Sequence, residues 1–330
     1  MNKKITIQDI ANMAGVAKST VSRYLNGGYV SKEKTTILDK VISETGYKAN
    51  FFAKHLKAKN SKLIGIVMSR VDSYSAGKLL AGINFILQKK GYQALILISE
   101  LSQEKELDHI LQLIEQGVDG IIVQSIGITK KHLKIVKDAQ IPIIFTGQSH
   151  EEINFIKVDD KGAGKLMGEY IAKLNHQNVV YLGVSSKDIA VGENRYKGFI
   201  KGFKKNAPNG KVNFVKTDFS FEKAYAKGKE VVQNKPTAVV CSTDNIALGL
   251  LRYLHEHNIK IPQEISLAGF GGYPIGDVSY PSLTSLAFDY KHLGAKTAEK
   301  LLLMINGEQV HSEFDSNMLF LTRESTQKIE

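Results

Sequence analysis

The sequence predicts an α/β protein in which a small helical head and a hinge helix precede a two-lobed body with parallel sheets. Three observations support this prediction. Residues 15–26 combine a tight turn with a short helix that has one polar, basic face. Short apolar runs then alternate with amphipathic stretches in two successive series along the 330 residues. The charge is uneven, because residues 1–60 hold eleven Lys/Arg and four Asp/Glu, which gives +7 of the net +11.

The head begins with two helices joined by a glycine turn. Thr6 and Asp9 have the spacing of a capping box, which predicts the start of the first helix. Gly15 supplies the backbone freedom that a sharp corner between helices needs. Val21 and Leu25 stand four residues apart in the second helix and therefore share one face. The expected head core consists of Ile10, Ala11, Ala14, Val21 and Leu25.

The other face of the second helix is polar and carries no acidic residue. It presents Lys18, Ser19, Ser22 and Arg23. Short donors allow a helix to enter a groove, and an arginine can read guanine or hold phosphate. Together with the positive charge of the first 60 residues, this face predicts double-stranded DNA as a partner. The alternative is an ordinary helical hairpin in a core.

A third helix completes the predicted head. Ser31 is expected to cap it, the helix runs to about Glu44, and Gly46 ends it. Its apolar side carries Ile37, Leu38, Val41 and Ile42.

Residues 47–61 form the expected hinge. Asn50 can cap a short helix that places Ala53 and Leu56 on one face, with lysines beside them. So short a helix is marginal in water by itself. We expect it to form on DNA, with Leu56 as a wedge in the minor groove; a plain basic linker is the alternative.

The body shows two similar series of strands and helices. The expected strands are 63–68, 94–98, 120–123 and 141–145 in the first series, and 179–184, 237–242 and 265–270 in the second. Continuous apolar strands that alternate with helices are typical of parallel sheets covered on both faces. Two series imply two lobes, with a ligand bound between them outside the carboxyl ends of the strands.

Polar and aromatic residues at the strand ends are the candidate ligand contacts. They are Asp72, Ser73, Tyr74, Gln124, Gln148 and Asp159 in the first lobe, and Arg195, Phe219, Asp244, Phe270 and Tyr273 in the second. Sugars need paired hydrogen bonds and an aromatic face, and this set offers both. Asp244 could instead cap a helix that begins at Ile246, and Arg195 could be a solvated helix charge.

Composition limits the class of protein further. The single cysteine, Cys241, fits a reducing compartment. No apolar run is long enough to span a bilayer, and the N-terminus lacks the apolar core of a secretion signal. We therefore expect a cytoplasmic, nucleoid-associated protein with no membrane partner. No zinc-ligand spacing, Gly-x-Ser-x-Gly elbow or P-loop occurs, so we expect no metal, no cofactor and no enzyme activity. No leucine heptads follow the last strand, so we expect a dimer without a coiled-coil tail.

Residues 6–11 and 15–26 resemble the DNA-binding headpiece of the lactose/galactose repressor family. The resemblance implies that Lys18 and Ser19 read bases and that Arg23 contacts phosphate or bases. The full set of DNA contacts that it implies is Thr6, Lys18, Ser19, Thr20, Ser22, Arg23, Asn26, Tyr47, Asn50, Ala53 and Leu56. One departure is Ala17, which stands where the family usually has a serine helix cap.

The body resembles the type I periplasmic-binding-protein-like body of the same family, which crosses between its lobes three times. We place the crossings near Asp160, Asp289 and Leu321. The expected domains are a head at 1–46, a hinge at 47–61, an N-terminal lobe at 62–159 and 290–321, and a C-terminal lobe at 160–289 and 322–330. The resemblance implies that Arg195 and Asp244 contact sugar hydroxyls. The family commonly has an aspartate after Phe270, where this chain has Gly271.

The resemblance implies a dimeric transcription repressor that leaves its operator when a sugar fills the cleft. Residues 22–31, 269–273 and 280–285 are similar to the sucrose-operon repressors of low-GC Gram-positive bacteria. Sucrose, fructose and a phosphorylated sugar all remain possible effectors. The alternatives are a global carbon-catabolite regulator with a phosphoprotein corepressor, a sugar-binding transport or sensor protein, and an enzyme on the same α/β plan.

Overall fold

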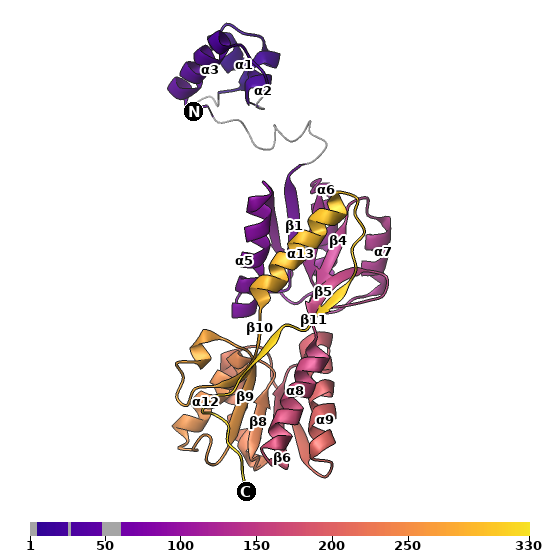
Figure 1. The fold of residues 1–330 in the computed structure, drawn as a ribbon, viewed down its shortest axis with the longest axis vertical. Helices are drawn as coiled ribbons and strands as arrows, with labels where there is room; N and C mark the ends of the chain where they lie inside the picture. The colour runs from indigo at the N-terminus through magenta and orange to yellow at the C-terminus, as the bar shows by residue number, and fades with distance from the viewer. Residues whose placement is uncertain (1–4, 26–27, 48–60) are drawn as a thin grey trace. The chain divides into compact units, whose positions relative to one another are not determined.

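A computed structural model of the chain describes residues 5–25, 28–47 and 61–330 (Figure 1). The chain divides into two compact units, Met1–Lys62 and Leu63–Glu330. The first contains the helical head and the second is the α/β body. Four of the expected DNA contacts, Asn26, Asn50, Ala53 and Leu56, lie outside the described residues.

The head has the three predicted helices, α1 (Ile7–Met13), α2 (Lys18–Leu25) and α3 (Lys32–Thr45). The capping box is confirmed: the Asp9 N–H donates to Thr6 Oγ1 at 3.3 Å, and the Thr6 N–H donates to the Asp9 carboxylate at 2.8 Å. The predicted core is also confirmed. Its buried members are Ile10, Ala11, Ala14, Val21 and Leu38, and Leu25, Val41 and Ile42 pack against them.

Two expectations for α3 were wrong. Ser31 stands at the N-cap position, but its side chain makes no capping hydrogen bond. Ile37 is 40% exposed, because Leu38 lies at the centre of the apolar face of the helix and Ile37 lies at its edge. Gly46 ends the helix in the left-handed conformation (φ 62°), as predicted.

The body consists of two lobes, each with a six-stranded sheet (Figure 1). The N-terminal lobe contains β1 (Leu63–Met68), β2 (Gln93–Ile98), β3 (Gly120–Gln124), β4 (Ile143–Thr146), β5 (Asn154–Val158) and β11 (Glu313–Asp315). Its sheet order is β11-β5-β4-β3-β1-β2, and every pair is parallel. Helices α5 (Tyr74–Lys89) and α13 (Tyr290–Ile305) cover one face, and α6 (Gln103–Glu115) and α7 (Lys130–Asp138) cover the other.

The C-terminal lobe repeats this plan. Its strands are β6 (Asn178–Gly183), β7 (Lys211–Lys216), β8 (Ala238–Cys241), β9 (Ser266–Gly271), β10 (Thr284–Phe288) and β12 (Met318–Leu321), in the order β12-β10-β9-β8-β6-β7. One face packs on α8 (Asp160–Lys173) and α9 (Arg195–Asn206). The other packs on α10 (Phe221–Ala226), α11 (Gly228–Gln233) and α12 (Asp244–Glu256). Two short turns, η1 (Ile189–Asn194) and η2 (Pro274–Gly276), precede α9 and β10.

The chain passes between the lobes three times. The first passage follows β5 and the second follows β10. The third lies at residues 316–317, between β11 and β12, and not near Leu321 as expected. The reason is that Met318–Leu321 pairs antiparallel with β10 and so already belongs to the C-terminal sheet.

Helices α8 and α9 approach each other through glycines. A Cβ placed on Gly164 would lie 2.0 Å from the carbonyl oxygen of Arg195, and one on Gly198 would lie 2.1 Å from that of Lys161. Only glycine therefore allows the two backbones to come this close. This contact sets the position of the first residue of α9, Arg195, relative to the first residues of α8.

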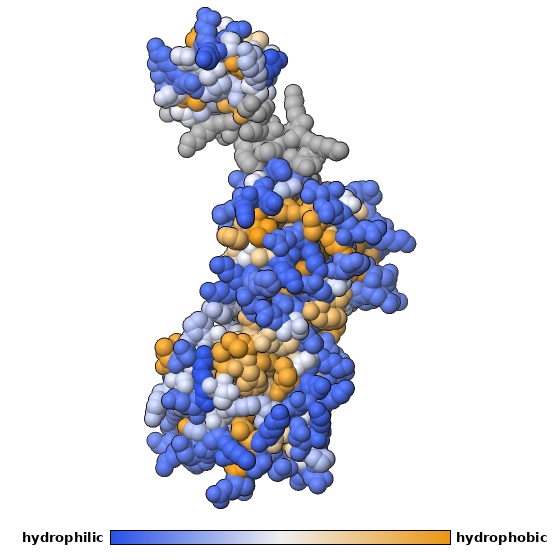
Figure 2. Space-filling model, viewed as in Figure 1, coloured by the Kyte–Doolittle hydropathy of each residue, from blue (hydrophilic) through white to orange (hydrophobic). Residues whose placement is uncertain are grey.

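Hydrophilic side chains cover most of the visible surface, and hydrophobic ones gather in patches on both lobes (Figure 2). No helix within the described ranges is long and apolar enough to cross a membrane.

Candidate effector cavity and nucleic-acid interface

Helix α2 presents a polar face of the kind that contacts nucleic acid. Lys18, Ser19 and Arg23 are exposed, whereas Val21 on the opposite side is buried. Thr20 and Ser22 are half-buried. The helix carries two cations and no carboxylate, so it can approach phosphates and base edges without charge repulsion.

Two other expected DNA contacts take part in the fold of the head. The Thr6 hydroxyl donates to the Asp9 carboxylate at 2.7 Å as part of the α1 cap. Tyr47 is half-buried and packs against the head core.

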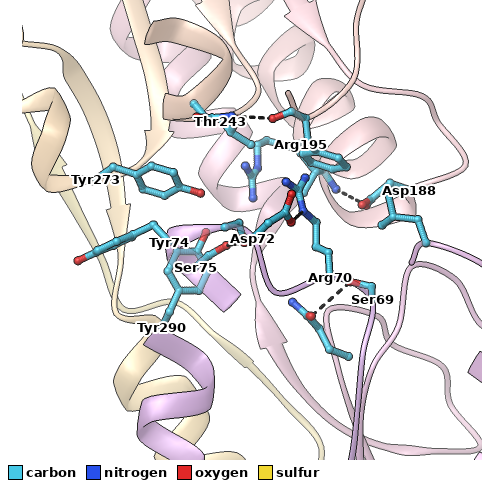
Figure 3. A pocket seen from close by; sticks show the side chains of 16 residues that line it. Ser69, Arg70, Asp72, Tyr74, Ser75, Asp188, Arg195, Thr243, Tyr273 and Tyr290 are labelled. Carbon is cyan, nitrogen blue, oxygen red and sulfur yellow. Dashed lines mark hydrogen bonds and ion pairs between the residues drawn. The ribbon is translucent and has the colours of Figure 1, made fainter. Parts of the chain in front are cut away.

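A cavity of about 260 Å³ is lined by residues of both lobes near the carboxyl ends of their strands (Figure 3). The expected contacts that line it are Asp72, Ser73, Tyr74, Gln124, Arg195, Phe219 and Tyr273. An adjoining cavity of about 130 Å³ shares Gln124 and Arg195 with the first and also contains Gln148. Eight of the eleven expected contacts therefore lie around one connected region.

Local structure fixes the N-terminal side of this cavity. Strand β1 ends at Met68, and the chain then turns along the cavity to the N-cap of α5. The Ser73 hydroxyl accepts the Ala76 N–H at 3.2 Å, which starts the helix and holds Tyr74 at its first position. The centre of the Tyr74 ring then lies 4.9 Å from the centre of the Tyr273 ring, and Tyr273 comes from the other lobe.

A second contact between the lobes involves Arg70. Its Nε donates to the Asp72 carboxylate at 2.6 Å, and its guanidinium lies 5.3 Å from the ring centre of Phe219. The hydrogen bond from Arg70 lowers the pKa of Asp72. Aromatic and charged groups of the two lobes therefore meet directly over the cavity.

Arg195 is the most strongly held side chain of the site. Its Nη1 donates to the Ser242 carbonyl oxygen and its Nη2 to the Asp160 carboxylate, both at 2.6 Å. The guanidinium lies over the rings of Phe270 and Phe288, at 4.9 and 5.2 Å from their centres. Burial disfavours the charge, but the combined attraction of Asp160, Tyr290 and Tyr181 outweighs it, so the pKa of Arg195 is raised. The buried Nε has no partner within the described residues. The solvated-charge interpretation of Arg195 is therefore wrong.

Asp244 does not line either cavity, contrary to expectation. Its side chain is buried and accepts the Tyr273 N–H at 2.7 Å and the Ser285 hydroxyl at 2.6 Å. Burial raises its pKa, and these hydrogen bonds oppose the shift. The cap of α12 is Thr243, so the helix-cap interpretation was wrong as well.

Two further expected contacts are absent from the linings of these cavities. Asp159 accepts the Gly162 N–H at 2.9 Å and caps α8, and its neighbour Asp160 holds Arg195 instead. Phe270 is buried beneath the Arg195 guanidinium. Asp159 is shifted by one position from Val158 and Asp160, which line the smaller cavity, because alternate residues at a strand end point in opposite directions.

Among the lining residues that sequence reasoning missed, Arg70, Asp188 and Tyr290 carry the charged and aromatic side chains. Arg70 could have been found, because it is the second residue after the end of β1. Asp188 caps η1, where its carboxylate accepts the Val191 N–H at 2.9 Å. Burial raises the pKa of Asp188. Tyr290 begins α13 after a strand that was not predicted, so no signal marked it.

This arrangement is suited to holding a ligand by hydrogen bonds and ring contacts. Carboxylates, amides and guanidinium groups alternate with the rings of Tyr74, Phe219 and Tyr273 around the cavity. Within the part of the chain that the structure describes, no group of three or more His, Cys, Asp or Glu residues is placed to hold a metal ion.

A helix-turn-helix head and a two-lobed body with a cavity between its lobes define a class of protein, the ligand-responsive DNA-binding transcription regulators. Comparison with known proteins identifies the family within this class. Residues 6–50 match the model of bacterial regulatory proteins of the lacI family, and residues 169–326 match a periplasmic binding protein-like domain.

Individual relatives agree with this assignment. The sucrose operon repressor of Staphylococcus xylosus is 33% identical over 92% of this chain and 95% of its own length. The transcriptional regulator TreR of Salmonella typhimurium is 26% identical over 93% of this chain and 96% of its own length. The crystal structure of the lac repressor dimer bound to operator and the anti-inducer ONPF superimposes with a TM-score of 0.89 at 23% identity, over 98% of this chain and 100% of that chain. The chain therefore belongs to the lacI family of bacterial regulatory proteins.

Proposed function

We propose that this chain represses a sucrose-utilisation operon and leaves its operator when a sugar occupies the cavity between the lobes. The observation that carries the proposal is the composition of that cavity, in which polar groups and rings from both lobes surround one region. The similarity to the sucrose operon repressor of Staphylococcus xylosus supports sucrose as the regulated sugar.

In this proposal, Gln124, Gln148, Asp188 and Arg195 bind sugar hydroxyls. Phe219, Tyr74 and Tyr273 contact the C–H surface of the rings. Because these residues come from both lobes, a bound sugar links the lobes and changes the angle between them. Asp244 and Phe270 act indirectly, by supporting Tyr273 and Arg195.

At the other end of the chain, Lys18, Ser19 and Arg23 of α2 enter the major groove of the operator. Thr20 and Ser22 contact the phosphates beside them. The protein acts as a homodimer on a near-palindromic operator in the cytoplasm, without a cofactor and without enzyme activity. Exposed apolar residues such as Val278 (76%), Tyr280 (83%) and Leu319 (64%) are suited to contact with a second copy.

The test begins with an operator selected from random duplex DNA by the full-length protein. Gel-shift titration of this duplex at fixed salt, with and without sucrose, should show that sucrose weakens binding. Calorimetry of the protein with sucrose, fructose and sucrose 6-phosphate then identifies the effector directly. If no sugar binds and a phosphoprotein tightens operator binding, the chain is a corepressor-dependent global regulator and the proposal is wrong.

A further inference from the structure

A buried group of charges lies beside the cavity where the lobes join. Lys157, Asp160 and Arg195 have side chains that are 2%, 4% and 4% exposed. One carboxylate oxygen of Asp160 accepts from Arg195 Nη2 at 2.6 Å, and the other lies 3.3 Å from Lys157 Nζ. Lysine is almost never fully buried unless it is paired, so the presence of Lys157 here depends on Asp160.

The group connects the two lobes. Lys157 belongs to β5 of the N-terminal lobe, whereas Asp160 and Arg195 are the first residues of α8 and α9 in the C-terminal lobe. Arg195 lines both cavities and Asp160 lines the smaller one, but Lys157 lines neither. One end of the group therefore reaches the ligand site and the other end does not.

The group also touches all three passages between the lobes. Asp160 stands at the first passage. Phe288, which ends β10 before the second, lies beneath the Arg195 guanidinium at 5.2 Å. Phe314, in β11 before the third, has its ring centre 5.9 Å from Lys157 Nζ.

Two cations share the Asp160 carboxylate in this group, and the Asp188 carboxylate is a further charge that interacts with Arg195. A buried charge is costly unless it is well compensated. The ring faces of Phe270, Phe288 and Phe314 supply part of the missing compensation. A rotation of one lobe against the other would break at least one of these contacts, so the group favours one lobe angle.

We propose that Asp160 and Lys157 are positioning residues that hold Arg195 in the cavity and transmit its contact with the effector to the three passages between the lobes. This inference rests on the proposed function, since it assumes an effector at Arg195. A sugar hydroxyl that engages Arg195 alters its bonds to Asp160, and Asp160 passes the change to Lys157 in the other lobe. Lys157 thus influences the response to the effector without touching it.

The first experiment needs neither sugar nor operator. Amide hydrogen exchange is measured on the full-length protein and its Lys157→Met and Asp160→Asn variants. The Asp159 N–H donates to the Asp315 carbonyl oxygen at 3.1 Å and joins the first and third passages, so peptides over 158–163 and 313–318 are informative. We expect exchange about tenfold faster there in both variants, with peptides of the buried strand β3 unchanged.

Two further variants make this experiment specific. Lys157→Arg keeps the charge and should retain most of the protection. Glu193→Gln removes the exposed Lys197–Glu193 ion pair on the same lobe and should leave exchange unchanged. Unaltered exchange at the passages in both Lys157→Met and Asp160→Asn would overturn the inference. Faster exchange throughout the body, β3 included, would also overturn it, because the group would then only stabilise the fold.

The second experiment uses sucrose and the selected operator. Asp160→Asn should weaken sucrose binding by about tenfold or more, because Arg195 loses a charge-assisted hydrogen bond. Lys157→Met should leave sucrose affinity within about threefold while reducing the ratio of operator affinities without and with sucrose. An unchanged ratio in Lys157→Met would contradict the inference. If the parent protein does not bind sucrose, the proposed sugar is wrong, whereas the exchange experiment still decides the role of the group.

Discussion

Asp244 shows how one carboxylate can support a cavity without lining it. Its two hydrogen bonds fix the backbone of Tyr273 and the hydroxyl of Ser285, and Tyr273 in turn lines the cavity. From the sequence, an aspartate a few residues after a strand at the cleft looks the same whether it faces outward or inward. Strand β8 ends at Cys241 and Asp244 begins α12, so the direction of its side chain depends on exactly where the strand ends and the helix starts. The same uncertainty separates Asp159 from Asp160.

Asp244→Ala is expected to lower the stability of the body. Two buried donors lose their acceptor, at about 1–3 kcal/mol for each donor left without a partner. Urea unfolding of the full-length protein measures the loss. If stability is unchanged while sucrose no longer binds, Asp244 is a ligand contact after all.

Asp244→Asn tests the same residue through pH. Burial raises the pKa of Asp244, so the folded state binds a proton more readily than the unfolded state. This contribution to stability is present at pH values below the unfolded pKa and is lost as the pH rises through the raised pKa. The asparagine variant cannot titrate, so its stability should fall less than that of the parent across this interval.

Arg23→Ala is expected to weaken operator binding while sugar binding and the fold stay unchanged. Arg23 is an exposed cation on the polar face of α2, and a good bidentate contact to a base contributes about 1–3 kcal/mol. Gel-shift titration at fixed salt measures the effect. Lys40→Ala is the matched control, because Lys40 is an exposed cation of the same head on α3. Equal operator affinities for the two variants would show that α2 does not contact the major groove.

At the scale of elements, the apolar strands were predictable, the edge strand β2 included, whereas β5, β7, β10, β11 and β12 were not predicted. Strands β1, β3 and β8 are apolar runs buried under helices on both faces, so their composition predicts them from the sequence. Strand β7 reads Lys-Val-Asn-Phe-Val-Lys and is mostly exposed, because it has a neighbour on one side only. The short β11 and β12 form only because distant strands are available for pairing. The local sequence pattern does not reveal such pairing. For this reason the third passage between the lobes was predicted at the wrong position.

Gly164→Ala is expected to destabilise the body by about 1–3 kcal/mol, as overpacking of a close contact does. The added Cβ would lie 2.0 Å from the carbonyl oxygen of Arg195, so α8 and α9 must separate. Gly77→Ala is the matched control: Gly77 also lies in a helix, α5, but a Cβ there meets nothing within 4 Å. That variant should be neutral or more stable by about 0.5–1 kcal/mol. Urea unfolding of both variants measures the difference, and equal stabilities would show that the helix contact tolerates side chains.

At the scale of the whole molecule, the body and the head were recognisable from sequence because each has a distinct pattern. The cavity between the two lobes of the body depends on contacts that no local pattern shows, such as Tyr74 against Tyr273 and Arg70 against Phe219. These pairs join residues about 150–200 positions apart, and they arise only when two lobes of similar topology face each other. A site built from both lobes in this way would change if the angle between the lobes changed, which is the requirement for a ligand-controlled switch.

Sucrose binding and operator binding are expected to be coupled. If sucrose lowers operator affinity, linkage requires the operator to lower sucrose affinity by the same factor, for which about 1–3 kcal/mol is typical. Calorimetric titration of sucrose into the free protein and into its operator complex should therefore give two affinities whose ratio equals that from gel shifts. Arg195→Lys keeps a cation in the cavity but loses the forked hydrogen bonds to Asp160 and Ser242.

This variant should bind operator as the parent does and respond only at higher sucrose concentrations. Arg252→Lys, at an exposed ion pair on α12, is its control and should respond at the parental concentration. A parental response in Arg195→Lys would exclude the guanidinium as a sugar contact. If sucrose instead tightens operator binding, the operator must also tighten sucrose binding by the same factor, because linkage holds whether the coupling is negative or positive. The cavity would then favour the lobe angle that binds DNA, and sucrose would act as a corepressor.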